Sequence, residues 1–402
     1  MDLRFTPEEA AFREEVRAFI RENLPAEIRE RMRLGHPARK QDTVAWQRIL
    51  NARGWAAYSW PAEWGGPGWT AVQRMIFLDE NLAAPAPDLS PFNITMLGPV
   101  LIRFGTEAQK RRFLPRAANL DDWWCQGFSE PGAGSDLAAL KTRAGREGDH
   151  YVVNGQKIWT STAHNADWCF CLVRTDTQTA KRQDGISFLL IDMRTPGVEV
   201  RPIISIDGSH HLNEVFFTDA RVPAENLVGE ENRGWSVAKF LLGNERTGIA
   251  RLGKSKERTR FAKKVAREVR ANGRPLIEDR AFRTRVAQLE VDMRALEITQ
   301  MRVVSAYDKA KDGGRPDPLS SVLKIKGTEL LQATSELVMD VGGPQAMPVW
   351  QQELAALANE PAVVPDWAPQ MAPAYLMLRA ASIYGGTNEI QKNILNKAVL
   401  GL

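Results

Sequence analysis

The chain has 402 residues, more than a single hydrophobic core usually organises, so two or three lobes are expected. Apolar residues make up 44% and charged residues 25%, a balance that excludes an intrinsically disordered chain. The 53 basic and 49 acidic side chains leave a net charge of +4, which does not by itself indicate a nucleic-acid-binding surface.

The composition also predicts where the protein works. No apolar run approaches the roughly 18–20 residues that cross a bilayer, and the N-terminal residues do not resemble a secretory signal. The only cysteines are Cys125, Cys169 and Cys171, an odd and sparse set that argues against a disulfide framework and favours the cytoplasm. The five histidines show no metal-ligand spacing, so no metal site is expected.

Residues 1–122 are expected to form a helical domain. The segment Thr6-Pro7-Glu8-Glu9 is a capping box with proline at the first helical position. Apolar residues then recur at helical spacing. Further helices are predicted at 41–53, 70–83, 93–104 and 106–119.

Residues 123–232 are expected to form a β domain. Asn154-Gly155 lies between two strand-like runs and predicts the tight turn of a hairpin. Further apolar runs predict strands at 168–173, 186–191, 198–204 and 213–217.

Residues 233–402 return to helical periodicity. Long amphipathic segments are predicted at 234–272, 280–310, 318–341 and 371–400, the last broken at Gly385-Gly386. Four such segments indicate a helix bundle. The expected fold is therefore a multidomain α+β protein: an N-terminal helical domain, a central β-barrel-like domain and a C-terminal four-helix bundle.

One segment of the β domain has the composition of a ligand-binding loop. It reads Cys-Gln-Gly-Phe-Ser-Glu-Pro-Gly-Ala-Gly-Ser-Asp over residues 125–136. Its glycines and proline force an irregular backbone, which presents N–H groups and the hydroxyls of Ser129 and Ser135 to a heterocycle or a phosphate. An ordinary tight loop explains the composition about equally well.

A second candidate segment follows the Asn154-Gly155 pair. Trp159 could stack on a flat ring, while Thr160 and Ser161 donate hydrogen bonds to the polar edge of that ring. The alternative is a core tryptophan in a strand, the commoner fate of such a residue.

Two more segments lie in the C-terminal part. Gly243 and Gly248 interrupt a helical stretch at a cost of about 1 kcal/mol each, and Glu245 between them is either functional or an exposed, ion-paired carboxylate. The segment from Ser382 to Gln391 is either a binding loop or a helix end followed by a new helix that Thr387 caps.

Together the four segments resemble the acyl-CoA dehydrogenase family, in order and over essentially the whole chain. Within that family the sequence is most similar to the large subunits of bacterial two-gene dehydrogenases such as pimeloyl-CoA dehydrogenase. The resemblance implies a flavoprotein that contains FAD, takes part in fatty-acid metabolism by β-oxidation and passes its electrons to an electron-transfer flavoprotein.

The resemblance also implies site residues. Phe128 and Ser129 would contact the isoalloxazine, and the other expected FAD contacts are Gln126, Ser135, Trp159, Thr160, Ser161, Thr387 and Glu389, the last two near the adenine half. The acyl-CoA would contact Ser135, Gly386 and Arg246, although Arg246 could instead orient Glu245.

In this family a carboxylate removes the α-proton of the thioester while the β-hydrogen leaves as hydride to the flavin. Most members carry that glutamate in a Tyr-Glu-Gly-Thr motif, where this chain has Tyr384-Gly385-Gly386-Thr387. A minority carries it directly before an arginine on the long helix, as in Glu245-Arg246. We therefore predict that Glu245 is the catalytic base and yields a trans-2-enoyl-CoA.

Two groups that the family usually lends to the FAD of a neighbouring subunit are missing. Val269 stands at the usual arginine position and Met339 at the usual glutamine position. The chain is therefore expected to form a heterotetramer with a related subunit that supplies these groups. In the alternative, Arg270 or Arg274 substitutes and a homo-oligomer works.

Other possibilities stay open at this stage. A flavin oxidase or monooxygenase on the same fold, or a subunit that only completes a partner's site, would have similar motifs. The basic stretch between Arg251 and Arg270 is interpreted as a solvated helix face rather than a nucleic-acid site. The acyl group could be a dicarboxylic, fatty or steroid side-chain acid, and the role of residues 344–373 is open.

Overall fold

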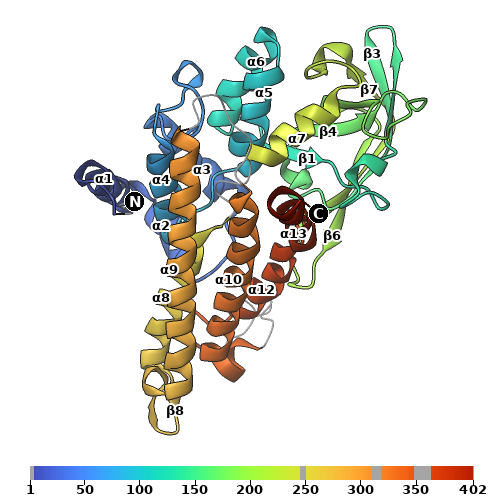
Figure 1. The fold of residues 1–402 in the computed structure, drawn as a ribbon. Helices are drawn as coiled ribbons and strands as arrows, with labels where there is room; N and C mark the ends of the chain where they lie inside the picture. The colour runs from blue at the N-terminus through green and yellow to red at the C-terminus, as the bar shows by residue number, and fades with distance from the viewer. Residues whose placement is uncertain (1–3, 245–249, 310–317, 348–363, 402) are drawn as a thin grey trace. The chain divides into compact units, whose positions relative to one another are not determined.

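The computed structural model describes residues 4–244, 250–309, 318–347 and 364–401. Two compact units are present: Met1–Asp42, Trp69–Asp88 and Arg246–Leu402 form one, and Thr43–Gly68 and Leu89–Glu245 form the other. The predicted order of helices, then sheet, then helices is confirmed (Figure 1). The predicted boundaries near residues 122 and 232 stay a prediction. No helix in the described part of the chain is long and apolar enough to span a membrane.

The first unit is helical. Its main helices are α1 (Pro7–Asn23), α2 (Ala26–Arg33), α4 (Ala71–Ala83), α8 (Leu252–Glu268), α9 (Arg280–Lys309), α10 (Leu319–Gly342), α12 (Met371–Met377) and α13 (Asn388–Leu395). The predicted capping box of α1 is confirmed: Thr6 accepts from the Glu9 N–H, and the Glu9 carboxylate accepts from the Thr6 N–H.

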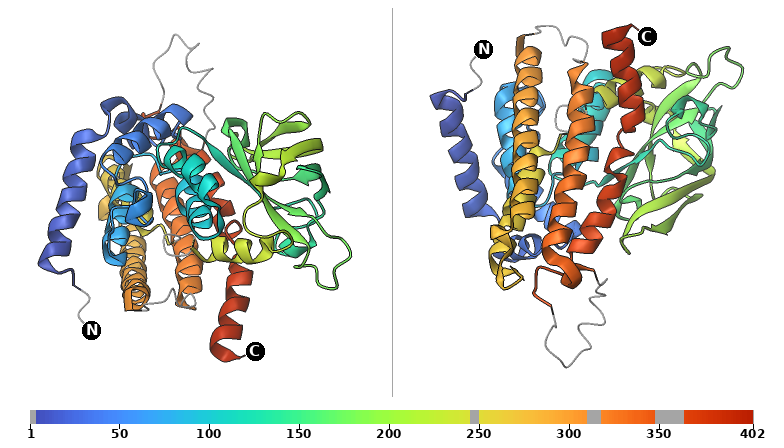
Figure 2. Two further views of the ribbon diagram at one scale, coloured as in Figure 1. Left: turned by 90° about the horizontal axis from the view of Figure 1, so that it is seen from above. Right: turned by 60° about the horizontal axis from the view of Figure 1, so that its bottom comes forward.

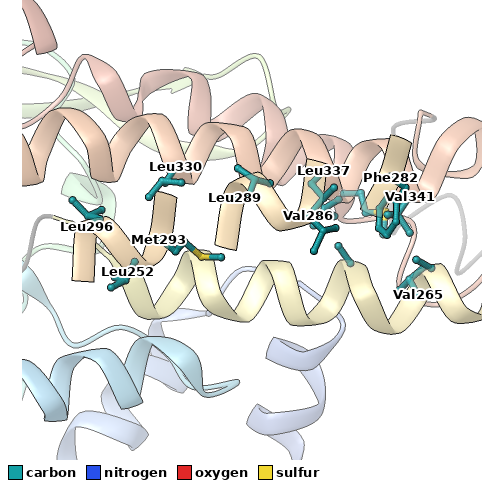
Figure 3. Close-up of a cluster of buried hydrophobic side chains, with 14 of the residues drawn as sticks. Leu252, Val265, Phe282, Val286, Leu289, Met293, Leu296, Leu330, Leu337 and Val341 are labelled. Carbon is teal, nitrogen blue, oxygen red and sulfur yellow. The ribbon is translucent and has the colours of Figure 1, made fainter. Parts of the chain in front are cut away.

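The core of this unit lies between α8, α9 and α10, which run side by side (Figure 2). Leu252, Met293 and Leu330 fill one end of the core, and Val265 and Val341 lie toward the other (Figure 3). The helices approach closely at Gly327, where a Cβ would come 2.6 Å from the Cα of Ala250.

The second unit combines a curled sheet with helices. The helices are most of α3 (Lys40–Ala52), the π-helical turn η2 (Phe92–Leu97), α5 (Gly98–Phe104), α6 (Glu107–Ala118) and α7 (Gly234–Asn244). The strands are β1 (Trp124–Gly127), β2 (Arg143–Glu147), β3 (His150–Lys157), β4 (Trp168–Arg174), β5 (Ile186–Asp192), β6 (Val198–Ile204) and β7 (His210–Pro223). Their order is β1-β4-β2-β3-β7-β6, with β5 paired to β4.

The hairpin predicted at Asn154-Gly155 is wrong. Strand β3 runs straight through this pair, and the turn lies earlier, at Gly148, which has a φ of +62°. Asn154 instead exchanges two hydrogen bonds of 2.9 Å with Asp219 on β7. Gly155 forms a bulge in which a Cβ would lie 2.6 Å from Oγ1 of Thr142. The dipeptide therefore allows strands to approach closely and does not reverse the chain.

The single long helix predicted over 234–272 is also wrong. Arg251 has a left-handed backbone with a φ of +46°, so α8 begins only at Leu252. The helix ends at Glu268, and β8 (Arg270–Ala271) and β9 (Arg274–Pro275) follow as a small hairpin. Here Asn272 and Gly273 both have positive φ, as a two-residue turn requires.

Candidate functional site

A buried ion pair joins the first two candidate segments. The ammonium of Lys157 lies 2.8 Å from Oε1 of Glu130 and donates to the Phe128 carbonyl at 3.1 Å. The Lys157 side chain is 0% exposed and that of Glu130 is 8% exposed. The pair therefore holds the loop after β1 against the end of β3.

Backbone groups complete this connection. The Glu130 carboxylate accepts from the N–H of Lys141 at 2.6 Å and of Thr142 at 2.9 Å, and the Ser129 carbonyl accepts from the Ile158 N–H at 2.9 Å. Burial acts to raise the pKa of Glu130, but the charge and hydrogen bond of Lys157, together with the hydrogen bonds from Thr142 and Lys141, outweigh it and hold that pKa below its usual range. Glu130 is therefore a carboxylate in the folded protein.

Trp159 is exposed and conformationally strained. It lies two residues after the end of β3, has a φ of +58°, and leaves 55% of its surface exposed. The alternative of a core tryptophan within a strand is therefore wrong. A left-handed backbone at a bulky residue costs of order 1–3 kcal/mol and is typical of ligand-binding positions. A large exposed indole in such a conformation is available to a planar ligand.

The next residue, Thr160, holds a buried hydroxyl that has no hydrogen-bond partner among the described residues. Its backbone is well held, because the Thr160 N–H donates to the Asn213 carbonyl and the Asn213 amide donates to the Thr160 carbonyl, both at 2.9 Å. Asn213 is oriented in turn by His210, whose Nε2 lies 2.8 Å from its Oδ1. The hydroxyl is thus rigidly positioned and available to a ligand.

The remaining predicted residues of this unit differ in exposure. Gln126, Ser129 and Ser161 are half-buried, and Ser135 is exposed. The Phe128 ring is buried and packs edge-on against Phe170 and Phe188. Only the backbone of Phe128 is therefore left to contact a ligand.

The fourth candidate segment lies in the helical unit. Thr387 caps α13 by accepting from the Ile390 N–H at 3.2 Å, as the helix-cap interpretation expects. Glu389 is exposed, and hydrogen bonds from its own backbone N–H and from Thr387 lower its pKa. Gly385 and Gly386 have φ values of +65° and +83°. The backbone is therefore exposed at the predicted substrate contact.

Two predicted residues, Glu245 and Arg246, lie outside the described residues. Three others escaped the sequence reasoning: Glu130, Lys157 and Asn213, which orient the first two segments. A lysine at the end of an apolar strand and a glutamate inside a glycine-rich loop were the available signals, since each needs a charged partner once it is buried.

The three cysteines, Cys125, Cys169 and Cys171, are free and buried. An interaction with Cys125 raises the pKa of Cys169, and burial raises that of Cys171, so neither is a reactive thiolate. In the described ranges, no cluster of His, Cys, Asp and Glu could hold a metal ion.

A cavity of about 720 Å³ lies elsewhere in the helical unit, and none of the predicted site residues that the structure describes lines it. Side chains of α1, α4, α8 and α9 form its walls, with Lys256 and Glu297 paired at 2.7 Å. Burial raises the pKa of Asp79 in its wall to about 6. The cavity is strongly charged and is separate from the motif residues.

Comparisons with known proteins agree with this arrangement. Family models for the N-terminal, middle and C-terminal domains of acyl-CoA dehydrogenases match residues 6–121, 125–220 and 232–400. The acyl-CoA dehydrogenase IpdE1 of Mycobacterium tuberculosis is 39% identical over 400 residues, covering 97% of both chains. The acyl-CoA dehydrogenase FadE26 of the same organism is 34% identical, covering 100% of this chain and 99% of the other.

Two solved structures are similar over the full length. The Tcur3481-Tcur3483 steroid ACAD has a TM-score of 0.84 and 28% identity, covering 100% of this chain and 99% of the other. The ChsE4-ChsE5 complex from Mycobacterium tuberculosis has a TM-score of 0.82 and 32% identity, with the same coverage. The chain belongs to the acyl-CoA dehydrogenase family of enzymes.

Proposed function

We propose that this chain is the flavin-holding, catalytic subunit of an FAD-dependent acyl-CoA dehydrogenase that forms trans-2-enoyl-CoA. The observation that carries this proposal is the end of β3, where the exposed, strained Trp159 precedes the buried, unsatisfied hydroxyl of Thr160. Both features cost the free protein stability, and a planar ligand with a polar edge compensates for both.

The residues at the end of β3 fit the flavin ring of FAD, which is planar and has a polar edge. Trp159 offers an aromatic face, and Thr160 offers a hydroxyl at a fixed position next to it. FAD, when bound, supplies the acceptor for the hydride that leaves the β-carbon. Gln126, Ser129, Ser135 and Ser161 would complete the isoalloxazine contacts, Phe128 would contribute its backbone, and Thr387 and Glu389 would contact the adenine half.

The proton chemistry falls to the chain itself. Glu245 would take the α-proton of the acyl thioester, while the β-hydrogen leaves with its electron pair and the Cα–Cβ double bond forms. Gly385, where most relatives carry the base, leaves room for a carboxylate from another segment. Ser135, Arg246 and the Gly386 backbone would contact the acyl-CoA, and hydrogen bonds to the thioester carbonyl would stabilise its developing charge.

Thr160→Val tests the flavin site directly. We expect the FAD-free chain to gain up to about 1 kcal/mol of stability, because valine keeps the shape and removes a buried hydroxyl without a partner among the described residues. FAD affinity should fall roughly 2- to 12-fold, the value of one hydrogen bond. Flavin fluorescence titration and thermal unfolding measure the two effects.

Thr162→Val is the matched control. The Thr162 hydroxyl accepts from Nε1 of Trp123 at 3.1 Å and donates to the Ser161 carbonyl at 2.8 Å, so its loss should destabilise the chain. If Thr160→Val lowers stability as Thr162→Val does and leaves FAD affinity unchanged, the flavin assignment is wrong.

We also infer that the active form is a heteromer. Val269 and Met339, which replace the two groups that the family lends across subunits, pack against the core of α8, α9 and α10. Arg270 donates to the Gly273 carbonyl of its own hairpin at 3.3 Å. The Tcur3481-Tcur3483 and ChsE4-ChsE5 structures are each named for two proteins, which supports a second subunit here.

The heteromer is tested by flavin content. The chain purified alone should contain clearly less than one FAD per polypeptide, and co-expression with a related subunit should restore about one FAD per site together with turnover. Absorbance at the flavin and protein bands gives the ratio. Full flavin occupancy and turnover by the chain alone would show that a homo-oligomer is sufficient.

The acyl group is tested with a panel of CoA thioesters and an artificial electron acceptor. Dicarboxylic, straight-chain and polycyclic acyl groups are the three classes to compare, the last because one similar structure is named a steroid enzyme. Anaerobic reduction by the thioester followed by slow reoxidation in air would support a dehydrogenase, whereas rapid reoxidation would indicate an oxidase.

A further inference from the structure

Three cationic side chains lie at the start of helix α8, one on the residue before the helix and two within its first turns. Arg251, Lys254 and Arg258 are spaced i, i+3 and i+7, so they lie above one another along the helix. All three are only partly exposed. We refer to them as the α8 cationic face; α8 itself is labelled in Figure 1.

Two acidic groups, Asp88 and Glu257, compensate part of this charge. Arg251 donates to Oδ2 of Asp88 at 2.5 Å, and Asp88 follows α4 in the same unit. Lys254 and Arg258 have neither a hydrogen bond nor an ion pair from their side chains to any described residue. Nη1 of Arg258 is buried and unpartnered within those residues.

This arrangement is costly for the free protein. Burial lowers the pKa of Lys254 and of Arg258, and the neighbouring cations of the face act in the same direction. A partly buried cation whose N–H group is shielded from water and lacks a hydrogen-bond partner destabilises a protein, and an anion that hydrogen-bonds to it recovers that loss. A guanidinium with a free, desolvated N–H is suited to a carboxylate.

The α8 cationic face lies close to the fourth candidate segment. Arg251 and Arg258 both lie within electrostatic range of the Tyr384 side chain, and Tyr384 directly precedes Gly385-Gly386. The ammonium of Lys324, which is buried, lies 5.8 Å from the centre of the Tyr384 ring and donates to the Ala381 carbonyl at 2.8 Å. The cations therefore gather beside the loop that, in the proposed function, faces the thioester.

We propose that the α8 cationic face binds a carboxylate on the acyl part of the substrate, with Arg258 as the main specificity residue. This inference rests on the proposed function and narrows its substrate class to acyl-CoA thioesters that carry a second, distal carboxylate. The phosphates of CoA are the other anions in the substrate. They are strongly hydrated, whereas Nη1 of Arg258 is shielded from water, which favours a compact carboxylate on an otherwise apolar chain.

The test compares two thioesters of equal chain length, one ending in a carboxylate and one in a methyl group. The enzyme is the FAD-loaded assembly with its partner subunit. Arg258→Met should lower kcat/KM for the carboxylate substrate about 10- to 100-fold, mainly by raising KM. For the methyl-ended substrate, kcat/KM should change less than about 2-fold. For the carboxylate substrate, kcat/KM of Arg258→Lys should lie between the values for Arg258→Met and for the unaltered enzyme.

Arg267→Met is the matched control, because Arg267 lies on the same helix, is exposed, and among the described residues bonds only to the Lys263 carbonyl. Arg267→Met should leave kcat/KM unchanged for both thioesters. Thermal unfolding should show Arg258→Met to be at least as stable as the unaltered chain, because the variant removes an unpartnered cation. A merely structural arginine would instead lower stability and both activities.

Three outcomes would overturn the inference. Equal losses for both thioesters would assign the face to the CoA phosphates. Unchanged kinetics in Arg258→Met would remove Arg258 from substrate binding while leaving the dehydrogenase proposal intact. Turnover of neither thioester by the unaltered assembly would remove the proposed function, and the inference with it.

Discussion

Glu245→Gln should reduce dehydrogenation by about 10³- to 10⁴-fold, at the upper end of the range for loss of a general base. Glutamine has nearly the same shape as glutamate but cannot accept the α-proton. FAD content and acyl-CoA binding should therefore stay close to those of the unaltered enzyme. Single-turnover flavin bleaching by acyl-CoA measures the chemical step, and equilibrium titration measures binding.

The Gly385 position allows a second and sharper form of this experiment. Adding Gly385→Glu to Glu245→Gln returns a carboxylate to the position where most relatives carry it, and partial activity should return. The φ of +65° at this position costs a non-glycine residue roughly 1 kcal/mol, which does not prevent folding. The double variant thus distinguishes a missing base from a general disturbance of the site.

Glu268→Gln is the control for a neutralised glutamate. Glu268 is the exposed last residue of α8, and its loss should not affect turnover. If Glu245→Gln retains full turnover, or if it loses bound FAD in proportion to activity, Glu245 is not the base.

Local signals in the sequence predicted much of the fold. The capping box at Thr6 needs only residues three apart, and the apolar runs that became β4 and β5 are buried throughout. Both signals are complete within a short window of sequence. The predicted alternation of helical and sheet regions follows from them.

Features that depend on distant residues were not predictable in this way. Asn154-Gly155 and Asn272-Gly273 are the same dipeptide, yet only the second forms a turn. The difference is Asp219, which is far away in the sequence and bonds to Asn154 on a neighbouring strand. The site shows the same limit, since neither the exposure of Trp159 nor the isolation of the Thr160 hydroxyl can be read from their neighbours.

Lys157→Met should destabilise the second unit, which contains the sheet, by about 3–5 kcal/mol, the usual cost of removing one member of a buried ion pair. Methionine fills the space of the lysine stem, but the Glu130 carboxylate then stays buried with only the Lys141 and Thr142 N–H groups as donors. FAD affinity should fall as well, because the segments around Ser129 and Thr160 lose both Lys157 bonds and stay joined only through backbone groups such as the Ile158 N–H and the Ser129 carbonyl.

Hydrogen exchange of the β3 amides in the full chain measures this local free energy of opening. Lys141→Met is the control, because its exposed side chain is removed while its backbone N–H still donates to Glu130. Protection of the β3 amides that is equal in Lys157→Met and Lys141→Met would show that the ion pair does not stabilise this part of the sheet.

The effect of Lys157→Met should also depend on pH in a direction that the pair determines. Glu130 has a lowered pKa in the folded chain, so its stabilisation is present above the usual glutamate pKa and is lost as pH falls through the lowered value. Without Lys157 the two largest effects that oppose burial are lost, so the pKa of Glu130 rises and the carboxylate takes up a proton at a higher pH. The loss of unfolding free energy in Lys157→Met should therefore be largest near pH 7 and become smaller in acid. A deficit independent of pH would mean that lost packing, rather than lost charge compensation, destabilises the variant.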